Sequence, residues 1–191
     1  MSSVTNPRGR LLLDASCLLN LYATGRMQDI AASTGYQFEV ADYVLQYETL
    51  YVLQTNSEGA EDERIPVDLD SLIEEGLLYV VELEGEDVLS SFVQLASLVD
   101  DGEAVTGALA LHRDCSVAID DRKARRVLGE VMPDVAHVST LELMRLWAQE
   151  ASVPVRELRE ALMAMQIGAS YVPGRRDPLY DWWTSAVSKS S

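Results

Sequence analysis

Short apolar runs alternate along the chain with longer segments in which apolar residues recur every three or four positions. Runs of the first kind are typical of buried strands, and the second spacing is typical of helices that bury one face. Strands are predicted over residues 10–14, 37–41, 77–83, 115–120 and 136–139. Helices are predicted over residues 15–23, 27–34, 43–54, 67–75, 86–99, 102–112, 122–131, 140–151 and 155–167.

This alternation predicts an α/β fold in which a parallel sheet carries helices on both faces. The length of 191 residues suits one domain with a small extension. The domain is predicted to span residues 1–153 with an acidic insertion at about 55–66, and residues 154–191 to add a helix and a tail bearing Trp182 and Trp183. Ligands of such sheets bind beyond the carboxyl ends of the strands. Residues that follow the strands are therefore the first candidates for function.

None of the apolar runs is long enough to span a membrane. A transmembrane helix needs about 18 or more consecutive apolar residues, and only three leucines precede Asp14, too few for a secretory signal. Cys17 and Cys115 are far apart in the sequence, which fits two buried thiols better than a metal-binding or redox pair. We therefore expect a cytoplasmic protein with no membrane segment.

The net charge of −16 is concentrated in the middle of the chain. Residues 56–103 contain fifteen acidic residues and a single basic one, Arg64, whereas the flanking parts are close to neutral. A strongly acidic surface repels nucleic acid and attracts cations or basic partners. The location of this block relative to the functional site therefore decides which partners the protein can bind.

Several carboxylates lie where an α/β sheet places functional groups. Asp14, Asp120 and Asp121 follow predicted strands, Glu48 lies on the helix predicted after the second strand, and Glu103 opens the helix predicted over 102–112. Each of them, taken alone, also fits a helix cap or a solvated end. Carboxylates that gather in one site repel each other and usually hold a cation, and oxygen ligands favour Mg²⁺ or Mn²⁺. The sequence alone does not bring the two glutamates next to Asp14.

Four segments resemble the PIN domain superfamily in their sequence and order. They are LLLDASCLLNLY, the VLQYET segment that contains Glu48, the block GEAVTGALALHRDCSVAIDDRKARRV, and the strand that begins AHVST. The GEA and DDRKAR signatures are similar to those of predicted PIN nucleases and of toxins from toxin–antitoxin pairs. The resemblance covers about residues 10–150. It implies a three-layer α/β fold with a five-stranded parallel sheet, and a metal-dependent ribonuclease activity.

The resemblance also implies roles for individual acidic residues. The expected catalytic residues are Asp14, Glu48, Glu103 and Asp121. The expected ligands of Mg²⁺ or Mn²⁺ are Asp14, Glu103, Asp120 and Asp121. The metal would lower the pKa of a bound water for attack on an RNA phosphodiester and would neutralise charge on the leaving oxygen.

Substrate binding is expected to involve Ser16, Arg122 and Lys123. Ser16 matches a small hydroxyl residue that the family often has near the metal, and the two basic residues begin the helix that follows Asp121. Arg125 lies in the same basic patch and is expected to have a partly structural role. As an alternative, the basic residues of this helix pair with neighbours such as Glu130 and bind no phosphate.

The partners expected from the resemblance are an RNA substrate, an antitoxin protein and a second copy of the chain in a homodimer. One alternative is a PIN-like domain without activity that serves as a binding or regulatory module. Another is a phosphoryl-transfer fold of the receiver or haloacid dehalogenase type. The segment ASC after Asp14 lacks the second aspartate of a dehalogenase, and the receiver's acidic pair would follow the first strand. Isolated His112 and His137 are expected to be structural.

Overall fold

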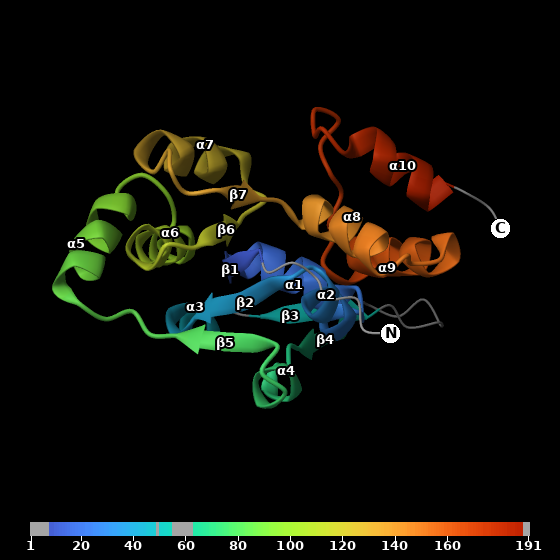
Figure 1. The fold of residues 1–191 in the computed structure, drawn as a ribbon, viewed down its shortest axis with the longest axis horizontal. Helices are drawn as coiled ribbons and strands as arrows, with labels where there is room; N and C mark the ends of the chain where they lie inside the picture. Colours follow the sequence, from blue (N-terminus) through green and yellow to red (C-terminus); the bar gives the residue numbers. More distant parts are fainter. Residues whose placement is uncertain (1–7, 49, 55–62, 189–191) are drawn as a thin grey trace.

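A five-stranded parallel sheet forms the centre of the computed structural model, which describes residues 8–48, 50–54 and 63–188 (Figure 1). In order across the sheet, the strands are β5 (Leu78–Val81), β2 (Tyr36–Ala41), β1 (Gly9–Leu13), β6 (Ser116–Ala118) and β7 (His137–Val138). Every neighbouring pair is parallel. The predicted α/β fold with five parallel strands is therefore confirmed.

Helices cover both faces of the sheet. α1 (Ala15–Ala23) and α2 (Met27–Ser33) connect β1 to β2, whereas α5 (Glu86–Leu95) and α6 (Asp101–Arg113) connect β5 to β6. These connections run in opposite directions across the sheet, and because parallel crossovers are right-handed, they lie on opposite faces. The remaining helices are α3 (Asp42–Tyr47), α4 (Asp70–Glu74), α7 (Arg122–Val131), α8 (Thr140–Glu150), α9 (Val155–Gly168) and α10 (Tyr180–Ser188).

Contacts between the helices complete a three-layer arrangement. α8 packs against α1 and α2, α9 packs against α1, and α6 packs directly on β1, β2 and β6. Figure 1 shows α5, α6 and α7 gathered at one side of the molecule and α8, α9 and α10 at the other. No helix in the described part of the chain is both long and apolar enough to cross a membrane.

The central strand β1 is apolar because both of its faces are covered. Leu11, Leu12 and Leu13 are all fully buried, as are Val117 and Ala118 of the neighbouring strand. Burying one leucine side chain contributes about 1.5–3 kcal/mol to stability. This rigid core fixes the position of the residues that follow β1 and β6.

The helix predicted over residues 43–54 is wrong in its second half. α3 ends at Tyr47, Glu48 has an extended backbone, and β3 (Tyr51–Gln54) pairs antiparallel with β4 (Glu63–Pro66). Aromatic and β-branched residues in Tyr51–Leu53 favour a strand, and the Arg64 guanidinium lies 4.5 Å from the centre of the Tyr51 ring. Most of the predicted acidic loop, residues 55–62, lies outside the described residues.

Two further helices are shorter than predicted. The helix predicted over 67–75 is confined to α4, because the Asp68 carboxylate accepts a hydrogen bond from the backbone N–H of Asp70 (3.0 Å) and forms a turn. The helix predicted over 86–99 ends with α5 at Leu95, and Ala96 caps it. These differences shift element boundaries without changing the sheet.

The predicted tail contains the helix α10, which packs against α9. Trp183 and Ala186 are buried on one face of this helix, and Leu179, which precedes it, is buried as well. The Asp177 carboxylate accepts a hydrogen bond from the backbone N–H of Leu179 (2.7 Å) just before the helix begins. The end of the described chain is thus anchored to the domain.

A buried ion pair joins the end of α6 to the sheet. Glu39 of β2 is 1% exposed, and its carboxylate lies 3.3 Å from the guanidinium of Arg113. Arg10 of β1 donates a hydrogen bond to the backbone carbonyl of Arg113. A buried carboxylate needs such a partner because desolvation penalises its charge.

Candidate active site

The candidate site lies where the chain reverses its direction across the sheet. The chain passes from β1 through β2 to β5 on one side, and from β6 to β7 on the other. Adjacent parallel strands whose connections leave in opposite directions form a crevice at their carboxyl ends, the usual ligand site of such sheets. Asp14 follows β1 at this point, and its backbone N–H donates to the carbonyl of Ala118 in β6 (3.0 Å).

Asp14 is a buried carboxylate without a basic partner. It is 5% exposed, and no ion pair to it is formed within the described residues. The Ser16 hydroxyl donates to Asp14 Oδ2 over 2.5 Å. Burial raises the pKa of Asp14 to about 6, and repulsion from Asp100 adds to this, although the Ser16 hydrogen bond opposes it.

Glu103 forms a capping box with Asp100 at the start of α6. The Glu103 N–H donates to Asp100 Oδ1 (2.9 Å), and the Asp100 N–H donates to Glu103 Oε2 (3.3 Å). Burial, together with repulsion from Asp100, Asp14 and Asp121, raises the pKa of Glu103 to about 7. Two of the predicted acids, Asp14 and Asp121, thus lie close enough to Glu103 to repel it.

Glu48 reaches the same turn of α6 from the end of α3. A Cβ atom at Gly102 would lie 2.8 Å from Glu48 Oε1, so the glycine leaves the space that this carboxylate occupies. Glu48 itself is exposed, because it follows α3 in an extended conformation. The structure therefore brings Glu48 to the α6 end of the site, next to Asp100.

Asp100 is the acidic residue that the sequence analysis missed. It lies between predicted helices and repels both Asp14 and Glu103. The pattern Asp-x-x-Glu ahead of the apolar residues 104–110 is a capping-box signature and could have identified it.

Asp120 and Asp121 are neighbours with different surroundings. Asp121 is exposed and caps α7, where its Oδ1 accepts from the Ala124 N–H (2.8 Å). Asp120 accepts from the Thr140 N–H (2.9 Å), the Thr140 hydroxyl (2.5 Å) and the side-chain amide of Asn20 (2.9 Å). Asp120 therefore joins β6 to α8 and α1, which favours a positioning role.

This difference predicts unequal losses of stability. Asp120→Ala removes the acceptor of three hydrogen bonds to buried residues and is expected to lower the free energy of unfolding by about 3 kcal/mol. Asp121→Ala removes one helix cap and is expected to cost about 1 kcal/mol. Urea denaturation in metal-free buffer measures both. Equal losses would show that the hydrogen bonds to Asp120 contribute no more to stability than the helix cap of Asp121 does.

The acidic cluster of Asp14, Asp100, Glu103 and Asp121 fits a divalent metal in its donor chemistry but not in its present arrangement. In the described ranges, no three side chains of His, Cys, Asp or Glu are close enough together to hold an ion as they are arranged. The donor chemistry does fit a hard cation, because the groups are all carboxylates and Asp14 has no positive partner. Asp14 and Glu103 are the residues that would hold Mg²⁺ or Mn²⁺.

The predicted substrate-binding residues lie around this cluster. Ser16 is exposed, and its hydroxyl is engaged with Asp14. Arg122 and Lys123 are exposed in the first turn of α7. Arg125 donates to the His137 carbonyl (3.4 Å) and lies 3.8 Å from the Glu142 carboxylate, which fits the structural role expected for it. Among the described residues Glu130 forms no ion pair with them.

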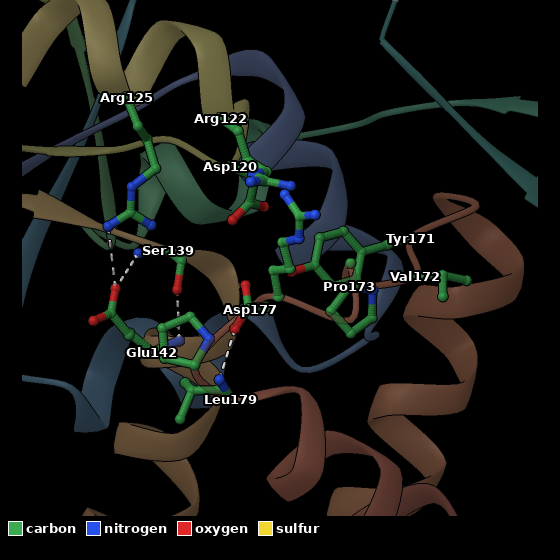
Figure 2. Close-up of a pocket in the computed structure, with 13 residues that line it drawn as sticks. Asp120, Arg122, Arg125, Ser139, Glu142, Tyr171, Val172, Pro173, Asp177 and Leu179 are labelled. Atoms are coloured by element: carbon green, nitrogen blue, oxygen red, sulfur yellow. Dashed lines mark hydrogen bonds and ion pairs between the residues drawn. The ribbon is translucent and has the colours of Figure 1, made fainter.

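A cavity of about 380 Å³ adjoins Asp120 on the α7 and α8 side (Figure 2). Its walls are the start of α7, the start of α8 and the segment 171–179 that precedes α10. Figure 2 shows Arg122, Arg125 and Asp120 on one wall and Tyr171, Pro173 and Asp177 on the opposite one. Sequence analysis could not find this cavity, because its walls are distant in the chain.

Comparison of the chain with models of known families, with curated proteins and with solved structures finds no match.

Proposed function

We propose that this protein is a divalent-metal-dependent ribonuclease of the PIN type. The observation that carries the proposal is the buried, unpaired Asp14 at the reversal point of the sheet, with Glu103 beside it and the pKa values of both raised. Crowded carboxylates without a basic partner are the usual surroundings of a bound cation. The motifs over residues 10–150 support the same activity.

Each residue has a defined part in this proposal. Asp14 and Glu103 would hold Mg²⁺ or Mn²⁺, with Asp121 nearby, and Ser16 fixes the orientation of the Asp14 carboxylate. Glu48 would position the attacking water, and Arg122 and Lys123 would contact RNA phosphates. The chemistry that a bound metal would supply is activation of water and neutralisation of charge on the phosphate.

Part of the acidic block lies at the far edge of the sheet from α7. α4 and β5, which lie within residues 56–103, occupy one edge of the sheet, whereas α7 follows β6 toward the opposite edge at β7. Strands are spaced about 4.8 Å apart, so β5 and β7 are separated by about 19 Å, roughly twice the screening length at physiological salt. Asp70 and Glu74 of α4 therefore lie away from the basic start of α7, whereas Asp100 and Glu103 of the same block belong to the candidate site.

Cleavage of a panel of single-stranded and structured RNAs tests the proposal. We expect cleavage by the wild-type protein in Mg²⁺ or Mn²⁺ and none when EDTA removes the metal. The readout is the appearance of shorter RNA fragments on a denaturing gel. Absence of cleavage with every RNA and both metals would contradict the proposal.

One observation favours a second function, that of an inactive PIN-like binding module. Asp100 and Glu103 each accept a hydrogen bond from the other's backbone, so helix capping already occupies both side chains. A Mn²⁺ titration that detects no site would support this alternative. An antitoxin partner and a homodimer are further proposals that rest on the motifs alone.

A further inference from the structure

The cavity beside Asp120 contains two arginines whose charge is not neutralised. Arg122 and Arg176 line it, and neither forms an ion pair within the described residues. Both are exposed at its mouth, so a ligand can reach them from solvent. Guanidinium groups in a recess are the preferred partners of phosphate oxygens.

The three carboxylates of the cavity are already engaged with protein donors. Asp120 accepts hydrogen bonds from Thr140 and Asn20. Glu142 accepts from the Ser139 N–H (2.7 Å) and pairs with Arg125, and Asp177 accepts from the Leu179 N–H. Arg122 and Arg176 are therefore the charged groups of the cavity that have no protein partner among the described residues and are available to an anion.

The opposite wall offers flat apolar surface. Tyr171, Pro173 and Leu179 contribute to it, and burial raises the pKa of the Tyr171 phenol, which keeps the ring neutral. An aromatic ring facing arginines suits a nucleobase with its phosphate, because bases stack on aromatic side chains and on guanidinium planes. The volume of about 380 Å³ is within the range of about 300–1,000 Å³ typical of small-ligand sites.

Two neighbouring residues connect the cavity to the candidate active site. Asp120 lines it, and the next residue, Asp121, repels Glu103 of the acidic cluster. We infer that the cavity binds one unpaired nucleotide of a single-stranded RNA next to the phosphate that is cleaved, with Arg122 and Arg176 on its phosphate and Tyr171 against its base. This inference rests on the proposed ribonuclease function. A paired base would first have to leave its stack to enter the cavity.

Arg175 provides a matched control for this inference. It is exposed, adjacent in sequence and of the same charge, but it does not line the cavity. Binding of a fluorescent single-stranded RNA octamer to the full chain is measured by anisotropy in EDTA, where no cleavage occurs. We expect Arg176→Ala to weaken binding about tenfold and Arg175→Ala less than twofold.

The outcomes separate this inference from the ribonuclease proposal. Equal weakening by Arg176→Ala and Arg175→Ala would overturn the cavity as the site, and so would equal binding of single-stranded RNA and a duplex of the same length. Arg176-dependent binding without cleavage in Mn²⁺ would support the cavity and contradict the nuclease. Metal-dependent cleavage that is unchanged in Arg176→Ala would support the nuclease and overturn the cavity.

Discussion

Asp14→Asn is expected to reduce metal-dependent RNA cleavage by about a thousandfold or more. The amide is neutral and holds a divalent cation poorly, and a metal ion contributes several kcal/mol to transition-state stabilisation, equivalent to about three powers of ten in rate. The side chain keeps its size and can still accept the hydrogen bond from Ser16. Rates of RNA cleavage under single-turnover conditions measure the effect. A rate equal to that of the wild type would show that Asp14 is not a catalytic residue.

The same substitution is expected to stabilise the fold at alkaline pH. The pKa of Asp14 is raised from 3.8 to about 6, so the folded protein holds this proton more tightly than the unfolded chain does. The free energy of unfolding therefore falls as the pH rises from about 4 to about 6 and stays lower above that range. Removing the charge is expected to recover about 3 kcal/mol at pH 8 and nothing at pH 4.

Denaturation of both proteins at pH 4 and pH 8 in EDTA tests this expectation. Asp181→Asn changes an exposed aspartate of α10 and serves as the control, with no expected gain at pH 8. Added Mg²⁺ is expected to raise the denaturation midpoint of the wild type at pH 8 and to leave Asp14→Asn unchanged, because a ligand stabilises only the form that binds it. A gain that is the same at both pH values would exclude burial of the Asp14 charge as its cause.

Arg113→Ala is expected to lower the free energy of unfolding by about 1–3 kcal/mol. The substitution leaves Glu39, which is 1% exposed, without its 3.3 Å ion-pair partner. The loss reflects an uncompensated buried charge, so it is expected to exceed the strength of the pair itself. Urea denaturation at pH 7 gives the size of the effect.

The double variant Glu39→Met, Arg113→Met separates these contributions. Replacing a buried pair by apolar side chains of similar size is often neutral, so we expect the double variant to be more stable than Arg113→Ala. A double variant that is as unstable as the single one would show that the attraction between the charges, and not desolvation, dominates at this position.

The sheet could be predicted from the sequence because central parallel strands are buried on both faces and must be apolar throughout. Residues 11–13 carry this signal without ambiguity, and Asp14 marks the end of the strand. The hairpin of β3 and β4 was missed because Tyr51 and Val52 continue the helical spacing of Val44, Leu45 and Glu48 and also fit a strand. A local pattern cannot distinguish a helix from a strand where pairing with another segment determines which one forms.

The candidate site was predictable only where it follows strand ends. Asp14 and Asp121 were placed by the topology, whereas the position of Glu48 depends on Gly102 and on the early end of α3. The cavity depends on the packing of segment 171–179 beside α7, a contact between residues about fifty positions apart. The spacing of residues in the sequence does not predict this packing.

The separation of β5 from β7 gives the molecule an electric dipole in addition to its net charge. The acidic residues Asp70 and Glu74 of α4, which packs against β5, lie toward one end of this dipole, and the arginines of the cavity lie toward the other. The net negative charge would repel an approaching RNA at long range. At short range the dipole would orient the RNA, so that productive encounters occur in one orientation. In this protein the negative charge would thus select the direction of approach, and salt would weaken that selection along with the repulsion.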